Sequence, residues 1–139
     1  MNVDALDRLL AAARSRLTRL PPDAALAALG QGARLVDIRP EFQRRRDGEI
    51  PGAIVIERNH LEWRLLPGSG ASIPEAVDND VAWIILCDEG FASSLAAATL
   101  QELGLQRTTE VIGGFRAWRA AGLPVGPPGA LTSPRLAGN

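Results

Sequence analysis

Short apolar runs alternate with segments of helical periodicity along most of this chain. The run at 83–86, Trp-Ile-Ile-Leu, has the length and the continuous apolar character of a strand that is buried on both faces of a sheet. Less regular runs predict further strands at 33–40, 54–56 and 111–112. Apolar residues at helical spacing predict helices or helical turns at 4–16, 23–29, 41–46, 61–66, 94–103 and 115–121. Strands that alternate with helices indicate an α/β fold with a central parallel sheet flanked by helices on both faces.

Proline, glycine and serine residues mark where several of these elements begin and end. Pro22 suits the first turn of a helix, and Gly30 suits the end of the same helix. Ser93 or Ser94 can cap the helix that follows the Trp-Ile-Ile-Leu run. Residues 18–20 are expected to form a short edge strand.

The length of 139 residues suits one domain with a sizeable core. We expect this domain to span residues 17–125. The pattern of residues 1–16 predicts an amphipathic helix. We favour a helix that packs on the domain, and the alternative is a helix that presents a surface to a partner. Residues 126–139 are rich in glycine, proline and small residues, which predicts a flexible tail.

Charge and cysteine content argue against several classes of function. The net charge is −1, and no block of like charges suggests nucleic acid or a membrane surface as a partner. No apolar run approaches the length of a transmembrane helix. The first residues, which include Asp4, Asp7 and Arg8, do not look like a secretion signal. The single cysteine, Cys87, excludes an internal disulfide, so we expect a cytoplasmic protein.

Charged residues and glycines gather where the predicted strands end. The carboxyl ends of parallel strands lie along one edge of a sheet, and ligands bind at that edge in such folds. The residues at these ends are Asp37, Arg39, Glu57, Arg58, Cys87, Gly113 and Gly114. We therefore expect a functional site at this edge, with Asp37 and Arg39 as a structural pair near it.

Cys87 has the strongest chemical signal of this set. It lies between the end of a predicted strand and the start of a predicted helix, where backbone N–H groups point at negative charge. Such groups would stabilise a thiolate or a persulfide, and the thiolate is the nucleophilic form of cysteine. The alternative interpretation is a small buried side chain without chemical function.

Several motifs occur in order around this cysteine. They are Leu35-Val36-Asp37-Ile38-Arg39, Gly48-Glu49-Ile50-Pro51-Gly52-Ala53, Cys87 with Gly90, Val111-Ile112-Gly113-Gly114-Phe115 with Trp118, and Gly122-Leu123-Pro124-Val125. In this order and spacing they resemble a single-domain rhodanese, a sulfurtransferase, from about Leu17 to Val125. The resemblance implies the three-layer rhodanese fold.

The same resemblance implies a chemical role for the cysteine loop. Cys87 would accept a sulfane sulfur as a persulfide and pass it to a nucleophilic acceptor, without a cofactor. The residues that would surround the sulfur are Asp88, Glu89, Gly90, Phe91, Ala92 and Ser93. The donor would be a small sulfane-sulfur compound or a protein persulfide, and the acceptor could be a protein.

At one position the sequence departs from the family pattern. Active rhodaneses often carry an arginine five residues after the cysteine, where it helps to bind an anionic donor, and this chain has Ala92 there. Asp88 and Glu89 would also repel a dianion such as thiosulfate. We therefore expect thiosulfate to be a poor donor. Two functions stay open, a sulfurtransferase, which we favour, and a non-catalytic rhodanese-like module that binds a partner or senses redox state.

The positions around Cys87 differ in whether they can supply positive charge to the site. A cysteine phosphatase needs an arginine six residues after the cysteine, and this chain has Ser93 there, which argues against that class. Arg58 leaves the strand at 54–56 at the same edge as Cys87 and is expected to supply positive charge. The alternative for Arg58 is a surface ion pair with Glu57 or Glu62.

The remaining aromatic and charged residues are expected to be structural. Trp63, Trp83 and Trp118 are assigned to the core because aromatic residues are few in this chain. Residues 44–46, three arginines, are expected to form a solvated face. His60 is expected at the surface or in packing, with a place on the rim of the site as the alternative, and a lone histidine does not make a metal site.

Overall fold

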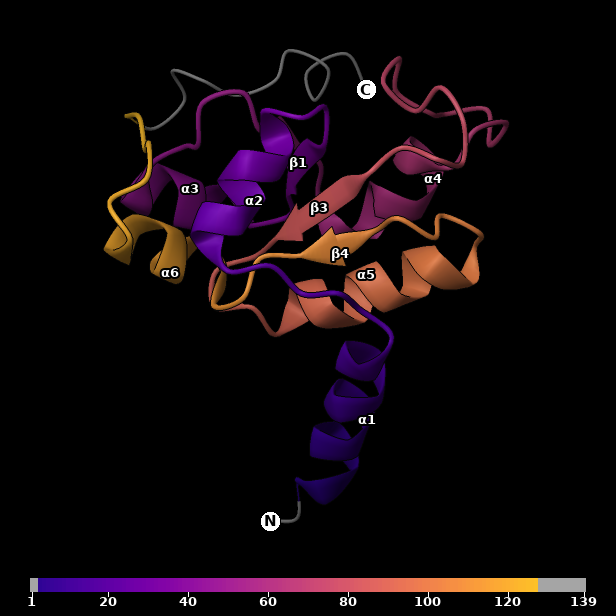
Figure 1. Ribbon diagram of the computed structural model, residues 1–139, viewed down its shortest axis with the longest axis horizontal. Coiled ribbons are helices and arrows are strands. Elements are labelled where there is room, and N and C mark those ends of the chain that lie inside the picture. Colours follow the sequence, from indigo (N-terminus) through magenta and orange to yellow (C-terminus); the bar gives the residue numbers. More distant parts are fainter. Residues whose placement is uncertain (1–2, 128–139) are drawn as a thin grey trace.

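The computed structural model describes residues 3–127, in which strands and helices alternate much as predicted (Figure 1). Its strands are β1 (Arg34–Asp37), β2 (Ile54–Val55), β3 (Trp83–Leu86) and β4 (Thr109–Glu110). Its helices are α1 (Asp4–Ser15), α2 (Pro22–Leu29), α3 (Glu41–Asp47), the 3₁₀ helix η1 (Arg58–His60), α4 (Leu61–Leu65), α5 (Ala92–Glu102) and α6 (Gly114–Ala120). The predicted α/β fold is confirmed.

The sheet has the strand order β2-β1-β3-β4, and all its strand pairs are parallel. The central pair, β1 and β3, runs in register from Arg34 beside Trp83 to Asp37 beside Leu86. Leu20 adds a parallel bridge to Val111, in the segment where a short edge strand was expected. Because the central strands end together, the residue after Asp37 and the residue after Leu86 lie at the same edge of the sheet.

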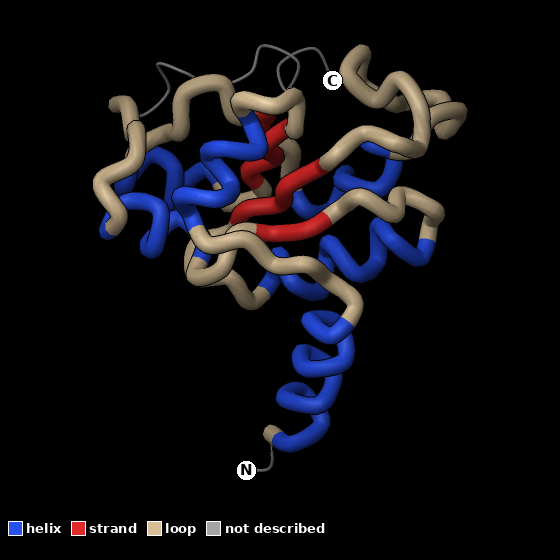
Figure 2. The backbone as a smooth tube through the Cα atoms, viewed as in Figure 1, coloured by secondary structure: helices blue, strands red, loops and turns tan. Residues whose placement is uncertain are grey.

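Two apolar clusters cover the two faces of the sheet and make the fold three-layered (Figure 2). Successive side chains of a strand point to opposite faces. Trp83 and Ile85 of β3 accordingly belong to one cluster, with side chains of α4 and α5, and Ile84 and Leu86 belong to the other, with side chains of α2 and α6. The continuous apolar run of β3 thus reflects burial on both faces.

Helix α1 lies partly outside the three layers. Its carboxyl-terminal part lies against α5 and buries Ala13, while its other end extends away from the sheet (Figure 1). Leu6 and Leu9 are 58% and 56% exposed. The division into segments 1–16, 17–125 and 126–139 stays a prediction, and residues 128–139 of the expected tail lie outside the described residues.

Two predicted boundaries differ from the structure. Helix α5 begins at Ala92, so Ser93 and Ser94 lie inside its first turn with buried side chains, and neither caps the helix. The last strand, β4, lies two residues before the predicted one, because Thr109 and Glu110 are the residues in register with β3. As a result, the polar side chains of Ser93, Ser94 and Glu110 lie in the interior near the carboxyl edge of the sheet.

The tryptophan assignment is correct for two residues and wrong for the third. Trp83 and Trp118 are buried, as expected. Trp63 is 58% exposed, because Leu61 and Leu65 take the core-facing positions of the short helix α4. Periodicity within five residues is too short a signal to fix which face of such a helix is buried.

Candidate functional site

Cys87 follows β3 directly, and the loop behind it folds around the sulfur atom. The backbone N–H groups of Gly90 and Ser93 donate hydrogen bonds to Sγ, at nitrogen–sulfur distances of 3.1 and 3.3 Å. The thiol itself donates to Ser93 Oγ, which lies 3.2 Å from Sγ. Only 7% of Cys87 is exposed. Backbone N–H groups that converge on one atom favour negative charge on it, so the loop suits a thiolate or a persulfide.

Two glycines let this loop close on the turn that follows β4. Gly90 has a φ of 89°, and a Cβ atom there would lie 2.9 Å from the backbone nitrogen of Gly113. Gly114 has a φ of 60°, and its Cβ would lie 2.5 Å from the carbonyl oxygen of Cys87. The backbone nitrogen of Phe115 donates to that same oxygen at 2.8 Å. The loop and the turn therefore fit together only where side chains are absent.

A pocket of about 340 Å³ opens beside the sulfur at the carboxyl edge of the sheet, where a site was expected. Residues that follow β1, β2 and β3 line it, namely Ile38, Arg39, Pro40, Gln43, Arg58, Cys87, Asp88, Glu89, Phe91 and Ala92. The structure thus brings Arg58 and the acidic loop residues to one pocket with Cys87. Gly90 and Ser93 are buried behind the sulfur.

The acidic residues of the loop differ in their surroundings. Asp88 Oδ2 accepts a hydrogen bond from Arg116 Nε at 3.0 Å, whereas Asp88 Oδ1 is buried without a hydrogen-bond partner among the described residues. Glu89 and Ala92 are exposed. The Arg116 guanidinium therefore compensates the charge of Asp88 but not that of Glu89. No cationic side chain on α5 takes the place of the family's arginine.

Arg58 reaches the pocket from η1 with its charge already shared. Its Nη1 donates to both carboxylate oxygens of Glu62, at 2.8 and 2.9 Å, and its side chain is 41% exposed. Arg58 therefore forms the ion pair with Glu62 and also lines the pocket, so the two alternatives that the sequence left open are both present. His60, two residues later, is exposed.

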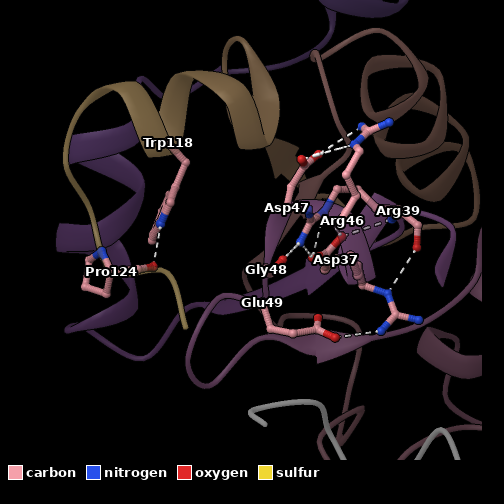
Figure 3. A network of polar contacts seen from close by, with 9 residues as sticks. Asp37, Arg39, Arg46, Asp47, Gly48, Glu49, Trp118 and Pro124 are labelled. Carbon is pink, nitrogen blue, oxygen red and sulfur yellow. Dashed lines mark hydrogen bonds and ion pairs between the residues drawn. The ribbon is translucent and has the colours of Figure 1, made fainter. Parts of the chain in front are cut away.

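Asp37 and Arg39 form a buried ion pair at the end of β1 (Figure 3). Arg39 Nη2 donates to Asp37 Oδ2 and to the carbonyl oxygen of Gly48, both at 2.8 Å. Burial raises the pKa of Asp37 above its ordinary value, and the Arg39 guanidinium acts in the opposite direction. Arg44, predicted to be solvated, is buried too, with its Nη1 3.0 Å from Glu49 Oε2. These two pairs fix the segment between β1 and β2 beside the pocket.

A second polar network lies behind the sulfur, and sequence reasoning missed most of it. Ser93 Oγ donates to Glu110 Oε1 at 2.5 Å, and Ser94 Oγ donates to the other carboxylate oxygen. Arg19 Nε lies 2.7 Å from Glu110 Oε2, and Arg14 Nε donates to Ser94 Oγ at 3.0 Å. A fully buried carboxylate is therefore separated from the sulfur by one hydroxyl group.

One sequence signal could have found Glu110. It is a carboxylate that directly precedes the predicted strand Val111-Ile112 and the double glycine. A charged residue at the start of a core strand is rarely buried unless it is paired. Arg14 gave no such signal, because an arginine on an amphipathic helix is ordinary, yet its Nη2 donates to the carbonyl oxygen of Gly90 at 2.9 Å.

Within residues 3–127, no group of histidine, cysteine and carboxylate side chains has an arrangement that could hold a metal ion. None of the helices in the same range is long and apolar enough to cross a bilayer.

Known proteins match this chain in sequence and in structure. The family profile described as a rhodanese-like domain matches residues 21–121. Thiosulfate sulfurtransferase GlpE of Pseudomonas savastanoi is 35% identical over 102 residues, which cover 73% of this chain and 87% of that protein.

Two solved structures share the fold over most of their length. A Rhodopseudomonas palustris protein of unknown function, described as a possible tyrosine phosphatase, has a TM-score of 0.77 and 34% identity, with 90% of this chain and 94% of that chain covered. The polysulfide-sulfur transferase homodimer of Wolinella succinogenes has a TM-score of 0.72 over 96% of this chain and 92% of that chain. At 22% identity the latter match shows a common fold.

Proposed function

This chain belongs to the rhodanese-like family, and from that premise we propose that it is a sulfurtransferase that carries a sulfane sulfur as a persulfide on Cys87. The observation that carries the proposal is the pair of N–H groups, from Gly90 and Ser93, that donate to Sγ. Relatives named thiosulfate sulfurtransferase support the class of reaction. The alternative is a non-catalytic binding or redox-sensing module, which Ala92 favours because it removes the family's arginine.

The transfer consists of two displacements at sulfur. In the first, the Cys87 thiolate attacks the sulfane sulfur of the donor. A new S–S bond forms, the donor's bond to that sulfur breaks, and the rest of the donor leaves with the bonding electrons. In the second, a nucleophilic acceptor attacks the outer sulfur of the persulfide, and Cys87 leaves as a thiolate. The protein is not oxidised or reduced overall, so the residues of the loop suffice without a cofactor.

The loop lacks the groups that phosphate chemistry would need. The residue six positions after the cysteine is Ser93, and its hydroxyl is bonded to the Glu110 carboxylate. A phosphate ester bound against this loop would meet negative charge behind the sulfur where a phosphatase requires a cation. We therefore do not extend to this chain the phosphatase description of its Rhodopseudomonas palustris neighbour.

The charges around the pocket favour a donor with little negative charge. Glu89 is exposed beside the sulfur, and Ala92 supplies no cation. We propose a small sulfane-sulfur compound or a protein persulfide as the donor, with a protein among the acceptors. We also propose a cytoplasmic location, because a single thiol that must stay reduced suits a reducing compartment.

The function is tested by sulfur transfer from an organic persulfide, with inorganic polysulfide as a second donor, to cyanide or to a small thiol, and the formation of product is measured. The proposal expects multiple turnovers per protein molecule. A protein that shows no turnover with polysulfide, with an organic persulfide and with thiosulfate would be a binding or sensing module instead.

Replacing Ala92 with arginine is expected to improve the use of thiosulfate. Ala92 lines the pocket and is exposed, so a longer side chain has room to reach an anion beside Cys87. A charge-assisted hydrogen bond contributes about 1.5–3 kcal/mol, which is roughly ten- to a hundredfold in kcat/KM for thiosulfate. Ala92→Met is the matched control, with similar length and no charge. Efficient turnover of thiosulfate by the unmodified protein would contradict the premise.

Replacing Arg58 with alanine is expected to raise the donor concentration that half-loads Cys87. Since Arg58 is partly exposed and shares its charge with Glu62, the expected change is about two- to tenfold for an anionic donor. Arg58→Lys should recover part of the loss. Glu62→Gln should act in the opposite direction, because it frees the guanidinium for the donor. Loading of Arg58→Ala at the original donor concentration would show that Arg58 serves only the ion pair.

A further inference from the structure

Three buried side chains form a hydrogen-bonded series from the cysteine to a carboxylate. The Cys87 thiol donates to Ser93 Oγ at 3.2 Å, and the Ser93 hydroxyl donates to Glu110 Oε1 at 2.5 Å. Ser93 and Glu110 are fully buried, and Cys87 is 7% exposed. The series connects β3, the first turn of α5 and β4, so the fold itself holds it in place.

The chemistry of the three groups fixes the direction of these hydrogen bonds. An ionised carboxylate only accepts, and a hydroxyl has one proton to donate. While Glu110 is ionised, the Ser93 proton points at Glu110, and Ser93 can only accept from the Cys87 thiol. A Cys87 thiolate reverses this requirement, because the sulfur has then become an acceptor. Both hydrogen bonds survive ionisation of Cys87 only if Glu110 gains a proton.

We propose that Glu110 is the internal acceptor of the Cys87 proton, with Ser93 as the relay. The proton on Sγ moves to Ser93 Oγ while the proton of the Ser93 hydroxyl moves to Glu110 Oε1. The result is a thiolate, an intact hydroxyl that now donates to it, and a neutral carboxyl group that donates to Ser93. No charge enters or leaves the network, so the thiolate forms in a buried site without transfer of a proton to water.

Cations hold the distal side of the network. Arg19 Nε bonds Glu110 Oε2, and Ser94 joins the same oxygen to Arg14 of α1. On the side of the pocket, the charged residues near Cys87 are Arg39, Arg58, Asp88, Glu89 and Arg116. Within the described range, no hydrogen bond joins Asp88 or Glu89 to Sγ or to Ser93. Glu110 is therefore the carboxylate with a bonded path to the sulfur.

Alkylation of Cys87 by iodoacetamide tests the proposal independently of sulfur transfer. The thiolate forms an S–C bond, the C–I bond breaks and iodide leaves, so the rate reports the thiolate fraction. Cys87 and Glu110 share one proton, which lies either on the sulfur or on the carboxylate. Both states bind the same number of protons, so the fraction of thiolate does not depend on pH as long as the pair holds exactly one proton. The pH profile of the unmodified protein should therefore show a plateau below the pH midpoint of Cys87.

Glu110→Gln should abolish the plateau, so that the rate falls about tenfold for each pH unit below the midpoint, as for an isolated thiol. Ser93→Ala should lower the plateau about tenfold or more, because the thiolate loses its hydroxyl donor. Ser93→Thr, which keeps the hydroxyl, should restore it. Ser94→Ala is the matched control, since Ser94 bonds the same carboxylate but not the sulfur. Its plateau should remain.

Two results with the variants would overturn the proposal. One is a plateau that persists in Glu110→Gln, and the other is a plateau that disappears equally in Ser94→Ala. Difference infrared spectra of the unmodified protein decide the matter even if the variants fail to fold. Below the pH midpoint of Cys87, these spectra should show thiolate absorbance together with the carbonyl band of a protonated carboxyl group, and this band should disappear as the pH is raised through the midpoint. Thiolate absorbance below the midpoint without this band would refute the proposal.

Discussion

Replacement of Cys87 with serine is expected to abolish sulfur transfer while the fold is retained. Serine keeps the shape of the side chain, and its oxygen can accept the hydrogen bonds that the N–H groups of Gly90 and Ser93 now donate to Sγ. A serine hydroxyl cannot form the S–S bond that the first displacement requires. We expect turnover to fall at least about 10³-fold, as when a covalent nucleophile is removed.

The measurement is turnover with an organic persulfide and with polysulfide, together with the free energy of unfolding of both proteins. Cys87 is the only cysteine in the chain, so no other thiol can replace it. Cys87→Ala serves as a second variant without any hydroxyl. Turnover in Cys87→Ser close to that of the original protein would mean that the protein binds the donor and the acceptor without a covalent intermediate.

Replacement of Gly114 with alanine is expected to destabilise the fold and to disrupt the Cys87 loop. A Cβ at this position would lie 2.5 Å from the carbonyl oxygen of Cys87 and 2.8 Å from two backbone atoms of Asp88. Backbone atoms cannot move aside as the end of a side chain can. The left-handed conformation and the overlap together should cost about 2–5 kcal/mol in the free energy of unfolding, with a parallel loss of sulfur loading.

Gly122→Ala is the matched control for this effect. Gly122 has a φ of 74°, similar to the 60° of Gly114, but no atom would lie within 4 Å of its Cβ. This variant should therefore show only the conformational cost, about 1–2 kcal/mol, with sulfur loading unchanged. Chemical denaturation and loading are measured on both proteins. Equal destabilisation by the two variants would show that the contact with the Cys87 loop has no importance of its own.

The parts of the fold that the sequence predicts well are those with local signals. Pro22 and Gly30 bound α2 as expected, because the fixed φ of proline suits the first turn of a helix and glycine is a poor helix former. The run Trp83–Leu86 became the strand buried on both faces, because its composition leaves no polar side for solvent. The carboxyl edge of the sheet followed from topology, since parallel strands end together.

The parts that it predicts poorly depend on partners from other elements. Arg44 reads as one of three consecutive arginines, yet it is buried because Glu49 lies beside it after the chain turns back. Ser93 reads as a helix cap, yet its hydroxyl faces Glu110, 17 positions away in the sequence. A local sequence pattern contains no information about partners that are distant in the sequence. The free energy of burying a polar group, however, depends on whether such a partner is present.

The absence of the family's arginine changes the charge around the pocket but not the backbone groups that surround the sulfur. Ala92 leaves the pocket without that cation, while Arg58 reaches the same pocket from η1. The backbone cradle around the sulfur is complete without either side chain, since Gly90 and Ser93 supply it from the main chain. Formation of the persulfide therefore depends on the cradle, whereas the choice of donor depends on the charges around it.

The intact mass of the protein shows whether Cys87 carries a transferable sulfur. The protein is treated with an organic persulfide or with polysulfide, freed of excess donor, and measured before and after addition of cyanide or a small thiol. We expect a gain of the mass of one sulfur atom that disappears when the acceptor is added, and no such gain in Cys87→Ser. An unchanged mass in the original protein, or an equal gain in Cys87→Ser, would contradict the proposed role of Cys87.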